Sequence, residues 1–171
     1  MNKNIKISYN INMEKDKVAP ILGKLVSGLY IISLKNGDAE AGFLASWVQQ
    51  AGFEPPCVSI AFNKSRKNLF DMLTGSGKLV VNFMAKENGK TMSRFFKPAP
   101  ETGSIFDELD TFKGVTGVPI LKDSLGYLEC EYLTEVSSSD HIIVIAKVIS
   151  GELLNSEIQP SVHVRPDGFK Y

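Results

Sequence analysis

The chain has 171 residues, 43% of them hydrophobic, which suffices for one domain with its own core over residues 1–171. Its 19 Lys and Arg balance 19 Asp and Glu, so it lacks the long-range positive field that gathers nucleic acid. Because no apolar run could span a bilayer and the polar N-terminus has no signal-peptide core, we expect a cytoplasmic protein that binds neither membrane nor nucleic acid.

Alternating apolar and polar residues, rich in β-branched side chains, predict many short strands. In chain order, the predicted strands are residues 5–11, 29–34, 41–48, 58–62, 79–84, 127–133, 141–149 (with a possible extension to 154) and 162–165. Asn36-Gly37 is a hairpin-turn signal, because both residues tolerate positive φ. Many short strands with few helices predict a mainly β fold, a closed or split antiparallel β-barrel with a few short helices.

The helices are predicted from apolar residues spaced three and four apart. They are residues 18–26, 65–73 and 88–96, and residues 98–117 read as a loop. Asp16 is the candidate cap of the first helix and Gly28 its candidate end, while Ser65 is the candidate cap of the second.

Familiar catalytic and metal-binding signatures are lacking. Cys57 and Cys130 lie far apart and belong to no CxxC motif, so we expect two reduced, buried thiols. Two histidines are too few for a histidine-rich metal site, and no metal is expected. Residues 75–78 (GSGK) read as a tight turn, because Leu79 stands where a phosphate loop needs Ser or Thr.

Two stretches carry candidate binding groups. Residues 42–56 place small, hydroxyl and amide residues after a strand and before a proline pair, which suits a flat heterocycle with carbonyls and ring nitrogens. Residues 63–67 place three cations where a helix begins, so Arg66 with Lys64 or Lys67 could bind a phosphate. The patterns alone favour simpler interpretations. Residues 42–56 would be a polar strand end with Trp47 in the core, and residues 63–67 would be a solvated basic turn.

Two further stretches leave both interpretations open. Asp140 could cap a turn that leaves His141 exposed, or His141 could place an imidazole beside a ligand pocket. His163 and Arg165 share one strand face, and the terminal Tyr171 could either fray or fold over a site.

Taken together and in order, these stretches resemble the flavin reductase-like family with the FMN-binding split barrel. The similarity runs from about Lys17 onward. It is strongest to the flavin reductase module at the C-terminus of cyanobacterial flavodiiron proteins. It rests on LASWVQQAGFEPP (44–56), NKSRKNLFDML (63–73), LVVNFM (79–84), GYLECEY (126–132), DHIIVIAKV (140–148) and VHVRPDGFKY (162–171).

The resemblance implies a mainly β fold, an antiparallel Greek-key split β-barrel with a few short helices, that forms a homodimer and binds FMN or, alternatively, FAD. It implies that the isoalloxazine and ribityl chain lie along Ala45, Ser46, Trp47, Val48, Gln49 and Gln50. It places Lys64, Arg66 and Lys67 by the phosphate, Asn82, Met84, Arg94 and Phe95 at the flavin border, and His141 as the catalytic residue on the nicotinamide side. Many relatives have Asn at the position of Ser46 and a smaller residue at that of Trp47.

The expected activity is hydride transfer from NADH or NADPH to flavin, as an NAD(P)H:flavin oxidoreductase. Such chemistry depends mainly on stacking and orientation, so no acid–base constellation is required. Two alternatives stay open: a flavoredoxin-like electron carrier with bound FMN and a redox protein partner, and a binding module that kept the fold for another ligand.

Overall fold

The computed structural model describes residues 14–96 and 103–170. The chain divides into two compact units, one formed by residues 27–163 and the other by the two chain ends, up to residue 26 and from residue 164. The strand predicted at residues 5–11 lies outside the described residues.

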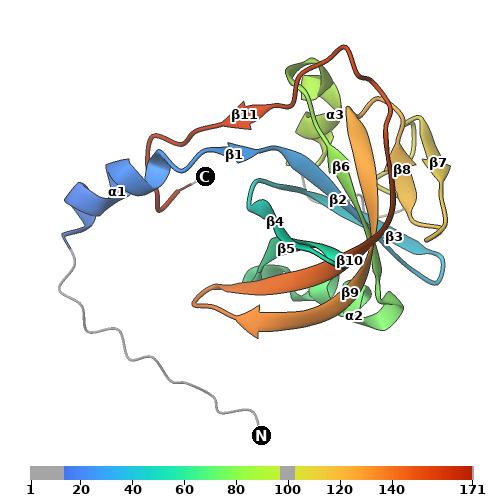
Figure 1. Cartoon of the computed structure of the whole chain (residues 1–171), viewed down its shortest axis with the longest axis horizontal. Helices are drawn as coiled ribbons and strands as arrows, with labels where there is room; N and C mark the ends of the chain where they lie inside the picture. Colours follow the sequence, from blue (N-terminus) through green and yellow to red (C-terminus); the bar gives the residue numbers. More distant parts are fainter. Residues whose placement is uncertain (1–13, 97–102, 171) are drawn as a thin grey trace, which may run out of the picture. The chain divides into compact units, whose positions relative to one another are not determined.

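The larger unit is built on a seven-stranded sheet in which every neighbouring pair is antiparallel (Figure 1). Its strand order is β3-β2-β6-β9-β10-β5-β4. The bounds are β2 (Tyr30–Asn36), β3 (Ala39–Ala45), β4 (Val48–Phe53), β5 (Pro56–Asn63), β6 (Lys78–Phe83), β9 (Gly126–Ser137) and β10 (His141–Leu153). Short pairs add β1 (Ser27–Gly28) with β11 (Val162–His163) and β7 (Thr111–Lys113) with β8 (Pro119–Leu121). This confirms the mainly β, antiparallel fold.

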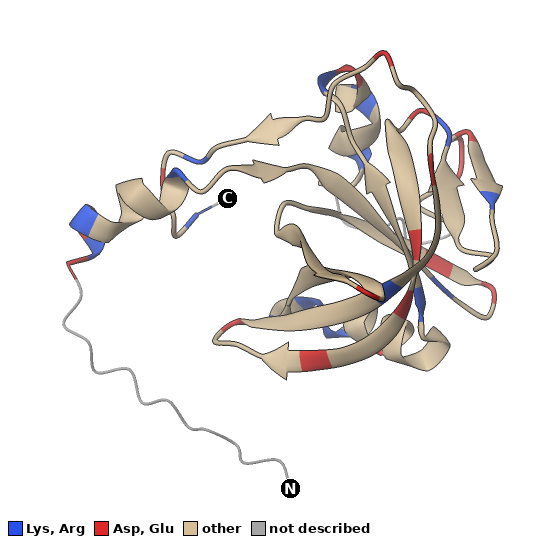
Figure 2. Cartoon of the chain, in the orientation of Figure 1, with Lys and Arg blue, Asp and Glu red and all other residues tan. Residues whose placement is uncertain are grey.

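Strand β6 shows why its sequence is almost continuously apolar. Leu79 and Val81 enter the main core inside the sheet, whereas Val80 packs with Val118 and Ile120 on the other face. A strand covered on both faces has no polar side, so the alternation seen in other strands disappears. Figure 2 shows that charges of both signs are spread over the strands and helices of this unit.

The sheet must curl, because consecutive strands lie at its two ends. β3 ends at Ala45 and β4 begins at Val48, yet the two strands are the opposite edges of the strand order. Three Cα–Cα steps span at most about 11 Å, so the edges meet at this link. The backbone N–H of Ala61 donates to the Trp47 carbonyl (3.0 Å), which extends the β4–β5 pairing into the link.

Several predicted boundaries shift. The hairpin turn is Gly37-Asp38 rather than Asn36-Gly37, because Asn36 still pairs with Ala39 and only Gly37 has positive φ (61°). The helical elements of this unit are η1 (Lys64–Arg66), α2 (Lys67–Ser76), η2 (Lys86–Asn88) and α3 (Gly89–Arg94). The prediction of a loop at 98–117 missed β7, which is only three residues long.

The smaller unit pairs helix α1 (Lys15–Gly23) with residues 164–170. The Arg165 N–H donates to the Gly23 carbonyl (3.0 Å), and the Gly168 N–H donates to the Ala19 carbonyl (2.8 Å). The predicted cap Asp16 lies inside α1, which Glu14 precedes without a side-chain cap. The predicted strand 162–165 shrinks to β11, since Arg165 instead holds the terminal turn.

Candidate functional site

The link between β3 and β4 carries the first candidate segment. Ala45, Ser46 and Val48 are buried at the ends of the two strands, whereas Gln49 and Gln50 are exposed on β4. Alternating side-chain orientation along β4 explains why Val48 is buried and Gln49 is exposed, but it would bury Gln50. Gln50 is exposed as well, and a bulge follows it in the pairing with β5. Two neighbouring amide side chains therefore face solvent beside the link.

Ser46 holds an unsatisfied polar group. Its side chain is 8% exposed, and among the described residues its Oγ is the one buried side-chain oxygen or nitrogen without a hydrogen-bond partner. Leaving a buried hydroxyl unpaired costs roughly 1–3 kcal/mol. Such a group is typical of a site whose hydrogen bond is completed by a ligand.

The neighbouring Trp47 brings the first and third candidate segments together. Its indole is 38% exposed and lies against the imidazole of His141, with ring centroids 4.7 Å apart and an interplanar angle of 42°. The side chain of His141 is nearly buried (4% exposed), which contradicts the interpretation of an exposed histidine at a capped turn. Trp47 is likewise a half-exposed wall rather than a core residue.

Asp140 orients this imidazole. Its Oδ1 lies 2.8 Å from Nδ1 of His141, and the Ser139 hydroxyl donates to the same oxygen (3.1 Å). The hydrogen bond to His141 is the main reason that the pKa of Asp140 lies below its usual value, with the Ser139 contact adding to it. A carboxylate held ionised beside Nδ1 fixes both the tautomer and the tilt of the ring.

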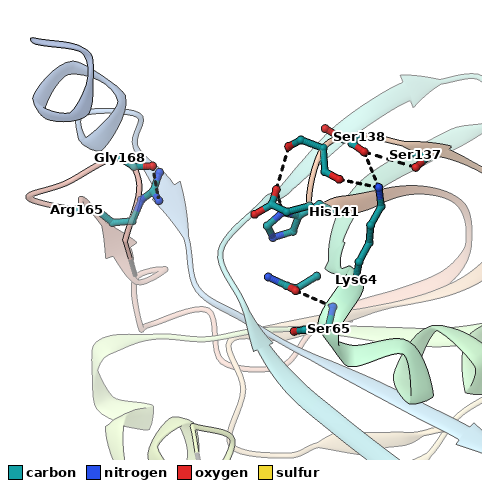
Figure 3. A network of polar contacts seen from close by, with 10 residues as sticks. Lys64, Ser65, Ser137, Ser138, His141, Arg165 and Gly168 are labelled. Atoms are coloured by element: carbon teal, nitrogen blue, oxygen red, sulfur yellow. Dashed lines mark hydrogen bonds and ion pairs between the residues drawn. The ribbon is translucent and has the colours of Figure 1, made fainter. Parts of the chain in front are cut away.

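The second candidate segment begins where β5 ends. Asn63 caps η1, because its Oδ1 accepts from the Ser65 N–H (2.9 Å), so the cap is Asn63 and not the predicted Ser65. The ammonium of Lys64 donates to the carbonyls of Ser138 (2.6 Å) and Ser139 (2.8 Å), as Figure 3 shows. This segment therefore contacts the turn that carries His141.

The other two cations have separate partners. The guanidinium carbon of Arg66 lies 5.8 Å from the ring centroid of Phe43, so the cation sits over a core aromatic ring near the end of β3. Lys67 forms an exposed ion pair with Asp71 one turn along α2 (2.7 Å to Oδ1). Arg66 thus keeps its donor groups close to the first segment, whereas Lys67 is engaged on the helix surface.

Three of the remaining predicted site residues lie in the interior. The amide of Asn82 is fully buried: it donates to the Ile31 carbonyl (3.0 Å) and the Ser33 hydroxyl (2.9 Å) and accepts from the Leu121 N–H (2.8 Å). Met84 and Phe95 pack in a second core cluster with Ile31 and Phe106. The fourth, Arg94, is partly exposed: it donates through Nε to the Ile105 carbonyl (2.6 Å) and pairs with Glu108 (3.4 Å).

The structure thus joins the three segments that the sequence singled out, through Trp47 with His141 and Lys64 with Ser138 and Ser139. Sequence reasoning missed the roles of Asp140 toward His141 and of Phe43 under Arg66. The acidic residue next to His141 was a signal for the first role, whereas the contact between Arg66 on η1 and Phe43 on β3, twenty-three residues apart, left none for the second. Tyr171 lies outside the described residues.

Some site types find no support within the described ranges. Residues 14–96 and 103–170 contain no group of three or more His, Cys, Asp or Glu placed to hold a metal ion. Across the same part of the chain, no helix is long and apolar enough to cross a membrane. The thiols of Cys57 and Cys130 are free and buried, as expected, and burial raises the pKa of Cys130 to about 12.

Comparison with known proteins agrees with this geometry. The model of the flavin reductase like domain family matches residues 22–169. Diflavin flavoprotein A 1 of Synechocystis sp. is 35% identical over 151 residues, which cover 88% of this chain and 26% of that protein. The chain spans between 26% and 29% of the length of the curated relatives it matches.

Solved structures show the same fold. An NADH:FAD oxidoreductase of Streptomyces globisporus superimposes with a TM-score of 0.78 at 20% identity, covering 96% of each chain. The flavin reductase HpaC, solved in complex with NADP+, gives a TM-score of 0.74 at 27% identity over 84% of this chain and 89% of its own. These likenesses identify the sheet as a flavin reductase split barrel.

Proposed function

The chain belongs to the flavin reductase-like family, and on that basis we propose that it binds FMN and passes a hydride to it from NADH or NADPH. Membership of this family supports a flavin-binding oxidoreductase. The observation that carries the proposal is the buried, unpartnered Oγ of Ser46 among the described residues, at the link where the three candidate segments come together.

The residues present fit a flavin. Ser46 supplies a hydroxyl that needs a partner, Gln49 and Gln50 supply exposed amides, and the indole of Trp47 supplies a flat apolar wall. Arg66 supplies a cation with planar donors suited to a phosphate. We infer that Ser46 holds the ring system and Arg66 the phosphorylated tail, and that Lys67 adds positive charge nearby.

A bound flavin supplies the hydride acceptor of the reaction. The chain's own groups bind and orient: we propose that His141, held by Asp140 and in tilted contact with Trp47, faces the nicotinamide. Orientation at close contact is the main requirement of hydride transfer, and these contacts support that role.

The direct test is to saturate the protein with FMN and mix it anaerobically with NADH or NADPH. We expect the yellow absorbance to bleach rapidly. A flavin that binds and stays yellow would contradict the reductase and favour an electron carrier, and a protein that ignores FMN would contradict flavin binding. Parallel titrations with FMN and FAD decide which flavin is preferred.

Assembly and electron acceptor are part of the same proposal. We infer a homodimer from the family resemblance, and the large apolar side chains left exposed on β4, β9 and β10 support it: Phe53, Leu133, Val136 and Leu153. Light scattering coupled to gel filtration checks this directly. We also propose a redox protein as one electron acceptor, because a bound flavin can pass its electrons to a second protein.

A further inference from the structure

Lys64 attaches the start of η1 to the turn between β9 and β10 through three hydrogen bonds. Its backbone N–H donates to the Asp140 carbonyl (2.9 Å), and its ammonium donates to the carbonyls of Ser138 (2.6 Å) and Ser139 (2.8 Å). Three consecutive carbonyls of the turn thus accept from one lysine. Two of the three ammonium protons are committed to them, which leaves the ammonium poorly placed to act on a ligand phosphate.

The turn that Lys64 holds ends the β9–β10 hairpin, which the Ser138 N–H closes by donating to the His141 carbonyl (2.9 Å). Residues 133–140 are all exposed, and an exposed turn of Ser residues stays mobile unless polar contacts order it. The next residue, however, is the nearly buried His141. Pairing with Asn63 of β5 places the backbone of His141, whereas the Asp140 carboxylate sets the tilt of its imidazole. Asp140 is the third residue of the segment that Lys64 fixes.

The contacts form one continuous path. Lys64 fixes the carbonyls of Ser138 and Ser139, the Ser139 hydroxyl donates to Asp140 Oδ1, and that same oxygen contacts His141 Nδ1. Figure 3 shows Lys64 extending toward the turn beside His141. The imidazole in turn lies on Trp47, in the segment proposed to hold the flavin ring. The path therefore ends at the face where hydride would be delivered.

We propose that Lys64 is a positioning residue: through the Ser138–Asp140 turn it holds the His141 imidazole against Trp47, and it does not bind the flavin phosphate. This inference rests on the proposed function for its catalytic consequence. Its structural half, that the Trp47–His141 contact depends on Lys64, holds for the flavin-free protein and can be tested without any activity.

The structural test uses the single tryptophan of the chain, whose indole N–H gives one resonance in a nitrogen–proton correlation spectrum. In flavin-free protein, Lys64→Met should move this resonance toward the position it takes in His141→Ala. Lys64→Arg keeps a cation that can donate to the same carbonyls, so its resonance should stay near the wild-type position. Lys122→Met, which breaks an exposed lysine–carboxylate pair with Asp110, should leave it unchanged.

The catalytic test compares FMN with riboflavin, which lacks the phosphate. At saturating flavin and NADH, Lys64→Met should slow bleaching about tenfold, because a small misplacement of a positioned group is costly. The loss should be equal with FMN and riboflavin, and FMN affinity should change little. Lys64→Arg should recover most of the rate, and circular dichroism should confirm that each variant is folded.

Two results would overturn the proposal: an indole resonance that Lys64→Met leaves in place, or a loss of FMN affinity without a matching loss for riboflavin, which would make Lys64 a phosphate ligand. If the wild-type protein never bleaches, the proposed function fails, and the indole resonance still decides the role of Lys64.

Discussion

Trp47 and His141 lie ninety-four positions apart in the chain, yet their rings are in contact, with centroids 4.7 Å apart. The contact joins the link between the two sheet edges to the start of β10. It exists because Asn63 at the end of β5 pairs with His141, while β4 pairs with the same β5. One strand therefore places the backbone that carries both rings, and the Asp140 contact sets the tilt of the imidazole.

Replacing His141 should separate chemistry from binding. We expect His141→Ala to slow the bleaching of FMN by NADH about tenfold or more, since it removes a group that orients the reactants. FMN affinity should stay largely intact, because the imidazole is proposed to face the nicotinamide. Stopped-flow absorbance measures the rate, and His163→Ala, at the only other histidine, is the matched control. Similar rates for the two variants would contradict the role of His141.

Replacing Arg66 should weaken binding of the phosphorylated tail. Arg66→Ala loses a charge-assisted hydrogen bond, so we expect FMN affinity to fall by roughly 1–3 kcal/mol. Isothermal titration measures this, and riboflavin serves as the internal control, because its affinity should hardly change. Equal FMN affinity in wild type and Arg66→Ala would refute the phosphate assignment.

Replacing Ser46 should affect stability and binding in opposite directions. Ser46→Ala removes the buried hydroxyl that has no partner among the described residues, so flavin-free protein should gain roughly 1 kcal/mol in the free energy of unfolding. The same change should weaken FMN, since the proposed hydrogen bond to the ring is lost. Urea unfolding and FMN titration check both signs, and a variant less stable than wild type would show that the hydroxyl already has a partner.

The raised pKa of the buried Cys130 thiol should make the protein less stable at high pH. Burial raises the pKa of its thiol to about 12, whereas an unfolded cysteine titrates near its usual value of about 8.5. Between these values the unfolded state loses the proton and the folded state keeps it, so the free energy of unfolding falls as pH rises. The free energy of unfolding of Cys130→Ala should fall less steeply than that of wild type over that pH range. Tyr30 and Tyr127, whose pKa values are also raised by burial, contribute equally to both proteins.

Local patterns predicted the elements well where one rule dominates. Val58, Ile60 and Phe62 alternate and are buried, and the apolar run at 79–84 is a central strand. The cap of η1 was misassigned, because Asn63 and Ser65 are both good caps and only the chain direction at the end of β5 decides between them. β1 and β11 have two residues each, too few for any periodicity.

The site was predicted by segment better than by side chain. Composition indicated that Lys64, Arg66 and Lys67 carry charge. Lys67 pairs with Asp71 of its own helix, but the other two partners lie on other elements: Ser138 in the β9–β10 turn and Phe43 on β3. Such pairings depend on the barrel's closure, which local sequence does not encode. Asn82 likewise reads as a polar residue available for binding, until the barrel surrounds it with Ile31, Ser33 and Leu121.

The Ser46–Trp47 link also limits how this protein can diverge. Only two residues connect β3 and β4, the two edge strands of the seven-stranded sheet. Each residue added to this link would let the two edges move apart and would shift Trp47 away from His141. Substitution within the link changes only what its side chains offer. New ligand preferences should therefore arise in this link by substitution, whereas insertions should accumulate in loops that do not connect β3 with β4.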